Sequence, residues 1–314
     1  MKKILCAVLA LVTVLSMAVA FTSCNKDPEA DLKKAYDKIV KDLKFNDADL
    51  PTLTVATSPD FAPMEFSDLS KSGQDQYVGF DIILAKYIAK ELNMKLVIKP
   101  MSFDSCMAAV TSGSADLAIS GFSWTALRAE TFLISDYYVA GDNETEQFVI
   151  TTKANADKFK TAESFKDAKV GAQGGSLQEL LVSEQLVTKG ATMVKMDNLN
   201  DLFAALKNGN IDALAVAKGN GDAFISGNED SVCFSGFEFQ VEEKYKNNVI
   251  LLNKNNAALL EKVNAALGKA MSANLYEGWY EACQIYSGIK TAASLATTIR
   301  ETRLPKPSKK SIET

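Results

Sequence analysis

Two segments of this chain, 108–119 and 204–215, align without gaps and repeat one pattern. Each holds an apolar helix, a glycine suited to a left-handed helix end, and an aspartate that leads a short apolar strand. The glycines are Gly113 and Gly209, and the aspartates are Asp116 and Asp212. Because helix–glycine–strand units are common in α/β proteins, chance similarity stays an alternative. Taken as a true repeat, the match predicts two similar lobes.

Other segments fit the same α/β fold class. Strand-like residues 53–56 and 95–98 enclose a helix with one apolar face at 80–92, and a second apolar stripe predicts a helix at 257–273. Strands that alternate with helices predict sheets with helices on their faces. Ligands of open α/β sheets bind beyond the carboxyl ends of strands, so the residues after the two repeated strands should face one cleft.

Residues 116–136 predict a binding site for a carboxylate. A short apolar strand runs into small hydroxylated residues and then into a helix start that carries Arg128. Ser123 and Thr125 stand where hydroxyls cap a helix. The planar guanidinium of Arg128 can bind a carboxylate through two parallel hydrogen bonds and keeps its charge. The alternative is a surface arginine in an exposed helix turn.

Composition excludes several function classes. The chain has 314 residues and no histidine, which removes the Ser-His-Asp triad, the Cys-His pair and the usual zinc ligand sets. Residues 1–23 hold two lysines and no acid, so the remainder has 32 Lys+Arg against 39 Asp+Glu and is a poor general nucleic-acid binder. Cys106, Cys233 and Cys283 match no metal motif, so neither metal nor cofactor is predicted. A bond between Cys106 and Cys283 stays open.

The first residues predict export. Met1-Lys2-Lys3 precedes an apolar run and then Cys24, an order typical of a signal peptide over 1–23 with a lipoprotein processing site at Cys24. Cleavage after Ala20 and an uncleaved membrane anchor are alternatives, and both also export the rest of the chain. Residues 24–50 are expected to form a lipid-anchored tether with one amphipathic helix that serves as a solvated spacer.

Four motifs carry a family resemblance. They are Gly79-Phe80-Asp81, Gly113-Ser114-Ala115-Asp116, the run from Ser120 through Thr125 to Arg128, and Ile134-Ser135-Asp136. In this order they resemble the extracellular solute-binding proteins of family 3, the amino-acid receptors of ABC importers. The resemblance implies a two-lobed periplasmic-binding-protein fold of type II, in which two hinge crossings join two sheets flanked by helices.

The same resemblance implies domain limits. Lobe one would comprise 51–141 and 245–288, lobe two would comprise 142–244, and 289–314 would form a C-terminal tail. The hinge crossings would lie near 142–148 and 240–246.

The resemblance also implies which residues line the ligand cleft. Lobe one would supply three aromatic rings, two hydroxyls, one backbone segment and the cation: Phe61, Phe103, Trp124, Ser120, Ser123, Gly121 and Arg128. Lobe two would supply a glycine turn and the N–H groups of a helix start at Gly175, Ser176 and Leu177. A glycine turn alone is a weak signal, since any tight strand-to-helix turn needs glycine.

Ala217 departs from the family pattern. Relatives commonly place an aspartate five residues beyond the position of Asp212, where it pairs with the ligand ammonium. A buried ammonium without a counter-charge is costly, so either another carboxylate serves or the ligand lacks a free amine there. Glu65 and Asp222 are the candidate substitutes, and Glu65 is favoured because its loop lines the cleft in the family.

The resemblance therefore implies a monomeric, lipid-anchored receptor on the periplasmic or outer face of the membrane. It would close on an amino acid or amino-acid-like carboxylate, held by Arg128 and two helix N-termini, and deliver it to a permease with its ATPase. One alternative is an enzyme of the same fold, dehydratase-like, with Glu65 as acid. Another is an extracellular sensor whose closed form a separate partner reads.

Overall fold

The computed structural model describes residues 28–138 and 146–289. The expected signal peptide, Cys24, most of the first hinge crossing and nearly all of the tail lie outside these residues. Within the described ranges no helix combines the length and apolar character needed to span a membrane.

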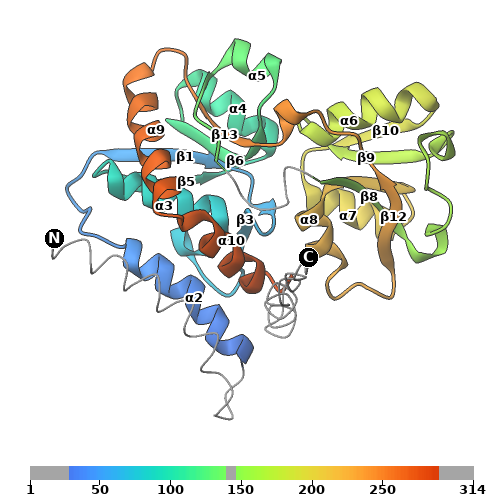
Figure 1. The fold of residues 1–314 in the computed structure, drawn as a ribbon, viewed down its shortest axis with the longest axis horizontal. Coiled ribbons are helices and arrows are strands. Elements are labelled where there is room, and N and C mark those ends of the chain that lie inside the picture. The colour runs from blue at the N-terminus through green and yellow to red at the C-terminus, as the bar shows by residue number, and fades with distance from the viewer. Residues whose placement is uncertain (1–27, 139–145, 290–314) are drawn as a thin grey trace, which may run out of the picture.

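Four strands of the first sheet come from the N-terminal half of the chain, and the fifth, β13, comes from near its C-terminal end, as Figure 1 shows. Its order is β5-β1-β6-β13-β7. The strands are β1 (Thr52–Thr57), β5 (Lys95–Pro100), β6 (Leu117–Ser123), β7 (Leu133–Ile134) and β13 (Asn248–Leu252). Its helices are α3 (Phe80–Glu91), α4 (Phe103–Ser112), α5 (Ala126–Thr131), α9 (Ala257–Ser272) and α10 (Leu275–Tyr286). We call this unit lobe one.

The second sheet, with its own helices, forms lobe two and has the order β10-β9-β11-β8-β12. Its strands are β8 (Gln147–Thr152), β9 (Lys169–Gln173), β10 (Thr192–Met196), β11 (Ala213–Ala217) and β12 (Val232–Glu238). Its helices are α6 (Leu177–Gln185), α7 (Leu199–Lys207) and α8 (Lys218–Ile225). Apolar clusters cover both faces of each sheet.

Short elements complete the described chain. A small antiparallel sheet over lobe one consists of β2 (Asp60–Phe61), β3 (Glu65–Ser67) and β4 (Tyr77–Val78). The 3-10 turns are η1 (Gly73–Gln76), η2 (Lys153–Asn155), η3 (Ala162–Phe165), η4 (Val187–Lys189) and η5 (Glu243–Tyr245). The chain returns from β12 to β13 through η5.

The internal repeat is confirmed, because its two copies occupy equivalent places. α4 leads into β6 beside β1, and α7 leads into β11 beside β9. Both glycines have left-handed backbone, with φ of +75° at Gly113 and +72° at Gly209. Each aspartate accepts a hydrogen bond from the neighbouring strand: Thr54 N–H donates to Asp116 at 2.7 Å, and Lys169 N–H donates to Asp212 at 2.8 Å. The repeat therefore anchors the central strand of each sheet.

The tether helix does not behave as a solvated spacer. Helix α2 (Pro28–Leu43) lies along α10 and α3 of lobe one (Figure 1). Tyr36 is fully buried in the lobe-one core, and its hydroxyl accepts a hydrogen bond from Gly79 N–H at 3.1 Å. The ring of Tyr36 also packs on that of Tyr286, with 4.4 Å between centroids. One apolar face thus attaches the helix to the body, since burial of that face removes apolar area from water.

The three cysteines of the described chain are free thiols. Cys106 and Cys283 are buried in different apolar clusters of lobe one, so the disulfide that the sequence left open is not formed.

Candidate ligand-binding site

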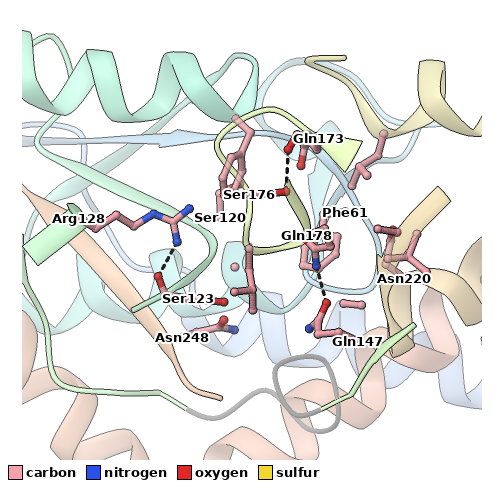
Figure 2. Close-up of a pocket in the computed structure, with 17 residues that line it drawn as sticks. Phe61, Ser120, Ser123, Arg128, Gln147, Gln173, Ser176, Gln178, Asn220 and Asn248 are labelled. Atoms are coloured by element: carbon pink, nitrogen blue, oxygen red, sulfur yellow. Dashed lines mark hydrogen bonds between the residues drawn. The ribbon is translucent and has the colours of Figure 1, made fainter. Parts of the chain in front are cut away.

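A pocket lies between the lobes at the carboxyl ends of β6 and β11, the location that the repeat predicted. Residues of both sheets line it, as Figure 2 shows. It brings together most of the residues predicted from sequence, namely Phe61, Phe103, Ser120, Gly121, Ser123, Arg128, Ser176, Leu177 and Ala217. Both lobes therefore contribute to one wall.

Arg128 is positioned by the strand-to-helix turn that carries it. Thr125 is the N-cap of α5, and its hydroxyl accepts a hydrogen bond from Arg128 N–H at 3.2 Å. The guanidinium donates from Nη1 to the carbonyl of Ser123 at 2.5 Å and from Nη2 to the carbonyl of Gly175 at 2.7 Å. The second bond joins lobe one to lobe two, because Gly175 lies in the turn before α6.

The guanidinium is buried without an anionic partner. Only 5% of Arg128 is exposed, and it makes no ion pair with any described residue. Burial lowers the pKa of Arg128 to about 10, an effect that Asp104 partly opposes, so the side chain stays charged at neutral pH. Its planar face lies over the rings of Phe103 and Phe122, at 5.6 and 5.1 Å from their centroids. These contacts hold the cation in place but do not neutralise it.

The turn before α6 differs in detail from the expected N–H cradle. Ser176 is the N-cap of α6, and its hydroxyl accepts from Glu179 N–H at 3.1 Å. Its own N–H donates to the carbonyl of Gln173 at 3.3 Å and is therefore used inside the turn. The N–H groups of Leu177 and Gln178 have no acceptor among the described residues, so these two helix-start donors are left for a ligand.

Gly121 is required by its neighbours. Its φ is +56°, and a Cβ there would lie 2.8 Å from the ring of Phe61. The ring of Phe61 therefore packs directly against the backbone at this position.

Three predicted residues do not line the pocket. Glu65 is fully buried behind Ser120, whose hydroxyl donates to its Oε1. Trp124 packs between apolar clusters of the two lobes and lines a separate hollow with Met271. Gly175 contributes its carbonyl to Arg128 instead of an N–H to the pocket.

Glu65 belongs to a buried pair of acids. Burial and the neighbouring Asp81 carboxylate raise the pKa of Glu65 well above its usual range, and burial raises the pKa of Asp81 to about 7. Asp81 accepts hydrogen bonds from Gly121 N–H at 2.7 Å and from the hydroxyl of Tyr138 at 3.1 Å. A general acid must reach its substrate, and Glu65 does not reach the pocket.

Amide side chains are the wall residues that sequence reasoning missed. They are Gln147, Gln173, Gln178, Asn220 and Asn248. Gln173 directly precedes the glycine turn, and Asn220 lies three positions after Ala217, so proximity to predicted positions could have suggested them. The positions of Gln147 and Asn248 follow from strand pairing, since Gln147 lies opposite Ala217 and Asn248 lies opposite Ser123.

The lobes also touch beside the pocket. The Asp60 carboxylate of lobe one accepts from Leu199 N–H, at the start of α7, at 2.8 Å and from Gln173 Nε2 at 3.2 Å. Burial raises the pKa of this carboxyl. The side-chain N–H₂ of Asn220 donates to the carbonyl of Ala62 at 3.4 Å. The structure is therefore a closed arrangement of the two lobes.

Known proteins share this sequence and fold. Residues 53–282 match the model of bacterial extracellular solute-binding proteins, family 3. The histidine-binding periplasmic protein of Escherichia coli (strain K12) is 28% identical over 203 residues, which cover 65% of this chain and 68% of that protein.

Solved structures give the same result. One is an amino acid ABC transporter substrate-binding protein from Streptococcus pneumoniae bound to L-arginine, with 31% identity, a TM-score of 0.68, and coverage of 76% of this chain and 97% of that one. Another is an ancestral arginine-binding protein bound to arginine, with 35% identity, a TM-score of 0.65, and coverage of 73% and 96%. The predicted type II two-lobed fold is thus confirmed. The chain belongs to the bacterial extracellular solute-binding proteins of family 3 and is a binding protein rather than an enzyme.

Proposed function

We propose that this protein is the receptor of an ABC importer and that it closes its lobes on an amino acid or amino-acid-like carboxylate held by Arg128. One observation carries the proposal: a fully charged, buried guanidinium lines the pocket and has no anionic partner among the described residues. A ligand carboxylate would supply that partner through a bidentate pair. The relatives named above, which bind histidine or arginine, support the choice of an amino-acid-like acid.

Closure would follow from how the wall is divided. Arg128, Ser120 and Ser123 belong to lobe one, whereas the free N–H of Leu177 belongs to lobe two. A ligand bound to both sets favours the closed form, because only that form offers all of its partners at once. The contact of Arg128 with the Gly175 carbonyl would assist closure.

Calorimetry with the purified protein tests this function. A thermal-shift screen of small carboxylates first identifies a ligand, since binding to the folded state raises the melting temperature. Arg128→Ala should then weaken its binding by about 2 to 5 kcal/mol, as for a truncated buried charge pair. Arg128→Lys is the matched control: it keeps the positive charge but not the two parallel hydrogen bonds of a guanidinium, so it should lose less binding free energy than Arg128→Ala. Unchanged affinity of the alanine variant would refute the assignment.

The cellular setting belongs to the same proposal. The N-terminal pattern supports export and acylation at Cys24, which would leave a monomeric receptor attached to the outer or periplasmic face of the membrane beside its permease. Cys24→Ser should abolish incorporation of radiolabelled fatty acid and release the protein from the membrane fraction. Labelling that persists in this variant would argue against the anchor.

A further inference from the structure

The polar wall of the pocket holds one charge. Among the described residues that line it, Arg128 is the single charged side chain, and the others that carry polar groups are hydroxyls and amides. The described wall contains no aspartate or glutamate. From the described residues of the wall, a ligand that is buried here therefore meets one positive charge and otherwise neutral hydrogen-bonding groups.

Asn220 supplies an acceptor that has no donor. The residue is 1% exposed, and its Oδ1 is buried without a hydrogen-bond partner. Its N–H₂ group faces the carbonyl of Ala62, which can only accept, so the amide orientation is fixed by that contact. Figure 2 shows the side chain at the pocket wall. A buried carbonyl oxygen left unpaired carries a desolvation penalty, which an N–H or O–H of a ligand would remove.

The nearby carboxylates cannot neutralise a ligand ammonium. Glu65 is fully buried behind Ser120 and does not line the pocket. Asp222 forms an ion pair with Lys218 away from the wall. The oxygens of Asp60 accept bonds from Ser58, Leu199 and Gln173. The two substitutes that the sequence suggested for the missing aspartate therefore do not serve.

Ala217 brings only a methyl group to the pocket wall. It lines the pocket, is 1% exposed, and is the N-cap of α8 without a side-chain cap bond. Taking an ammonium out of water with no counter-charge costs several kcal/mol, whereas a hydroxyl or amide N–H carries no such cost once it is hydrogen-bonded.

We propose that the ligand is a carboxylic acid whose donor toward Asn220 is uncharged, a hydroxyl or an amide N–H as in an α-hydroxy acid or an N-acyl amino acid, in place of a free α-ammonium. This inference rests on the proposed function, because Arg128 must hold the carboxylate. The neutral amides of the wall complement such groups, since each offers both a donor and an acceptor.

Calorimetry with three matched probes tests the ligand class: L-glutamine, N-acetyl-L-glutamine and the corresponding α-hydroxy acid. At least one neutral probe should bind about tenfold or more tightly than glutamine, the ratio that one hydrogen bond of about 1.4 kcal/mol produces. Tighter or equal binding of glutamine, or no binding of either neutral probe, would overturn the proposal. The two neutral probes distinguish a hydroxyl from an amide donor.

Two variants separate this inference from the proposed function. Ala217→Asp restores a carboxylate at an N-cap position that favours aspartate, so it should fold, and it should shift the preference toward glutamine by about tenfold or more. Asn220→Leu should weaken the neutral probe about tenfold. If Arg128→Ala leaves the binding of every probe unchanged, the proposed function fails. If Arg128→Ala abolishes binding but Ala217→Asp leaves the preference unchanged, only the present inference fails.

Discussion

The two lobes share one framework but differ in the charges that they bury. In the described chain, the buried charged residues Asp60, Glu65, Asp81 and Arg128 all belong to lobe one. Lobe two buries only neutral polar side chains, among them Gln147, Gln173 and Asn220. Under the proposed function, lobe one would supply electrostatic recognition and lobe two would supply neutral hydrogen bonds. Lobe two can move away from the ligand without leaving a buried charge of its own unpaired.

The framework is the part that both copies keep. Each central strand is bonded by the aspartate of the repeat, and each lobe receives one antiparallel strand beside the repeated strand, β13 in lobe one and β8 in lobe two. The first residues of these two strands, Asn248 and Gln147, both reach the pocket. The shared strand arrangement of the two lobes therefore determines the positions of these wall residues. The residue types at those positions determine which groups the wall offers to a ligand.

The first prediction compares the two copies of the repeat through the loss of stability when the aspartate of each copy is replaced. Asp116 accepts from both the N–H and the hydroxyl of Thr54, whereas Asp212 accepts from Lys169 N–H. At about 1.5 kcal/mol for each bond to a charged group, Asp116→Ala should lower the free energy of unfolding by about 3 kcal/mol and Asp212→Ala by about half of that. Urea unfolding measures both. The exposed Asp230→Ala is the control, and equal losses at the two sites would contradict the comparison.

Removal of Asp60 tests the contact between the lobes. Asp60→Ala removes the acceptor of Leu199 N–H and one of the two acceptors of the Gln173 amide in the closed form, so ligand affinity should fall about tenfold, or about 1.4 kcal/mol. Asp60→Asn keeps one acceptor oxygen and should recover part of the affinity. Calorimetry with the ligand from the screen measures the change. An alanine variant that binds as tightly as the native protein would show that the contact does not stabilise closure.

The buried acids predict a pH dependence that belongs to lobe one. The folded-state pKa of Asp81 is raised to about 7, and aspartates of unfolded chains titrate near pH 3.9, so the folded form binds more protons between these values. Stability should therefore decline by several degrees of melting temperature as the pH rises from about 4 through about 7. With no histidine in the chain, few other groups titrate near pH 7. Asp81→Asn should reduce the slope of the profile, and a profile that keeps its full slope would exclude Asp81 as the cause.

The last comparison concerns the helix that only lobe one carries, and the loss of a single hydrogen bond there should have the smallest effect. Tyr36→Phe removes the acceptor of Gly79 N–H but keeps the ring against Tyr286, so the free energy of unfolding should fall by about 1 kcal/mol. Tyr36→Ala removes the ring as well and should lower the free energy of unfolding by about 3 to 5 kcal/mol, as for other large-to-small core substitutions. Chemical denaturation compares the two variants, and a harmless Tyr36→Ala would mean that α2 is not docked in solution.

Much of the fold was predictable because its signals are local. The strand, glycine and aspartate of each repeat, the helix at 80–92 and the cap before Arg128 all depend on neighbours in sequence. Residues such as Gln147 and Asn248 were not predictable, because strand register between distant segments brings them to the pocket. The placement of Glu65 was missed for a related reason: Ser120 from another strand stands between it and the cavity.

The docking of α2 has a consequence for work at a membrane. Cys24, the proposed acylation site, precedes Pro28 at the start of α2 by four positions, a stretch that spans at most about 14 Å. Since α2 is packed on α3 and α10, a lipid at Cys24 would keep lobe one close to the bilayer surface. Lobe two would then carry out the motion of closure. A permease beside the receptor would then contact lobe one, which stays in place, and lobe two, which moves. The position of lobe two would indicate whether solute is bound.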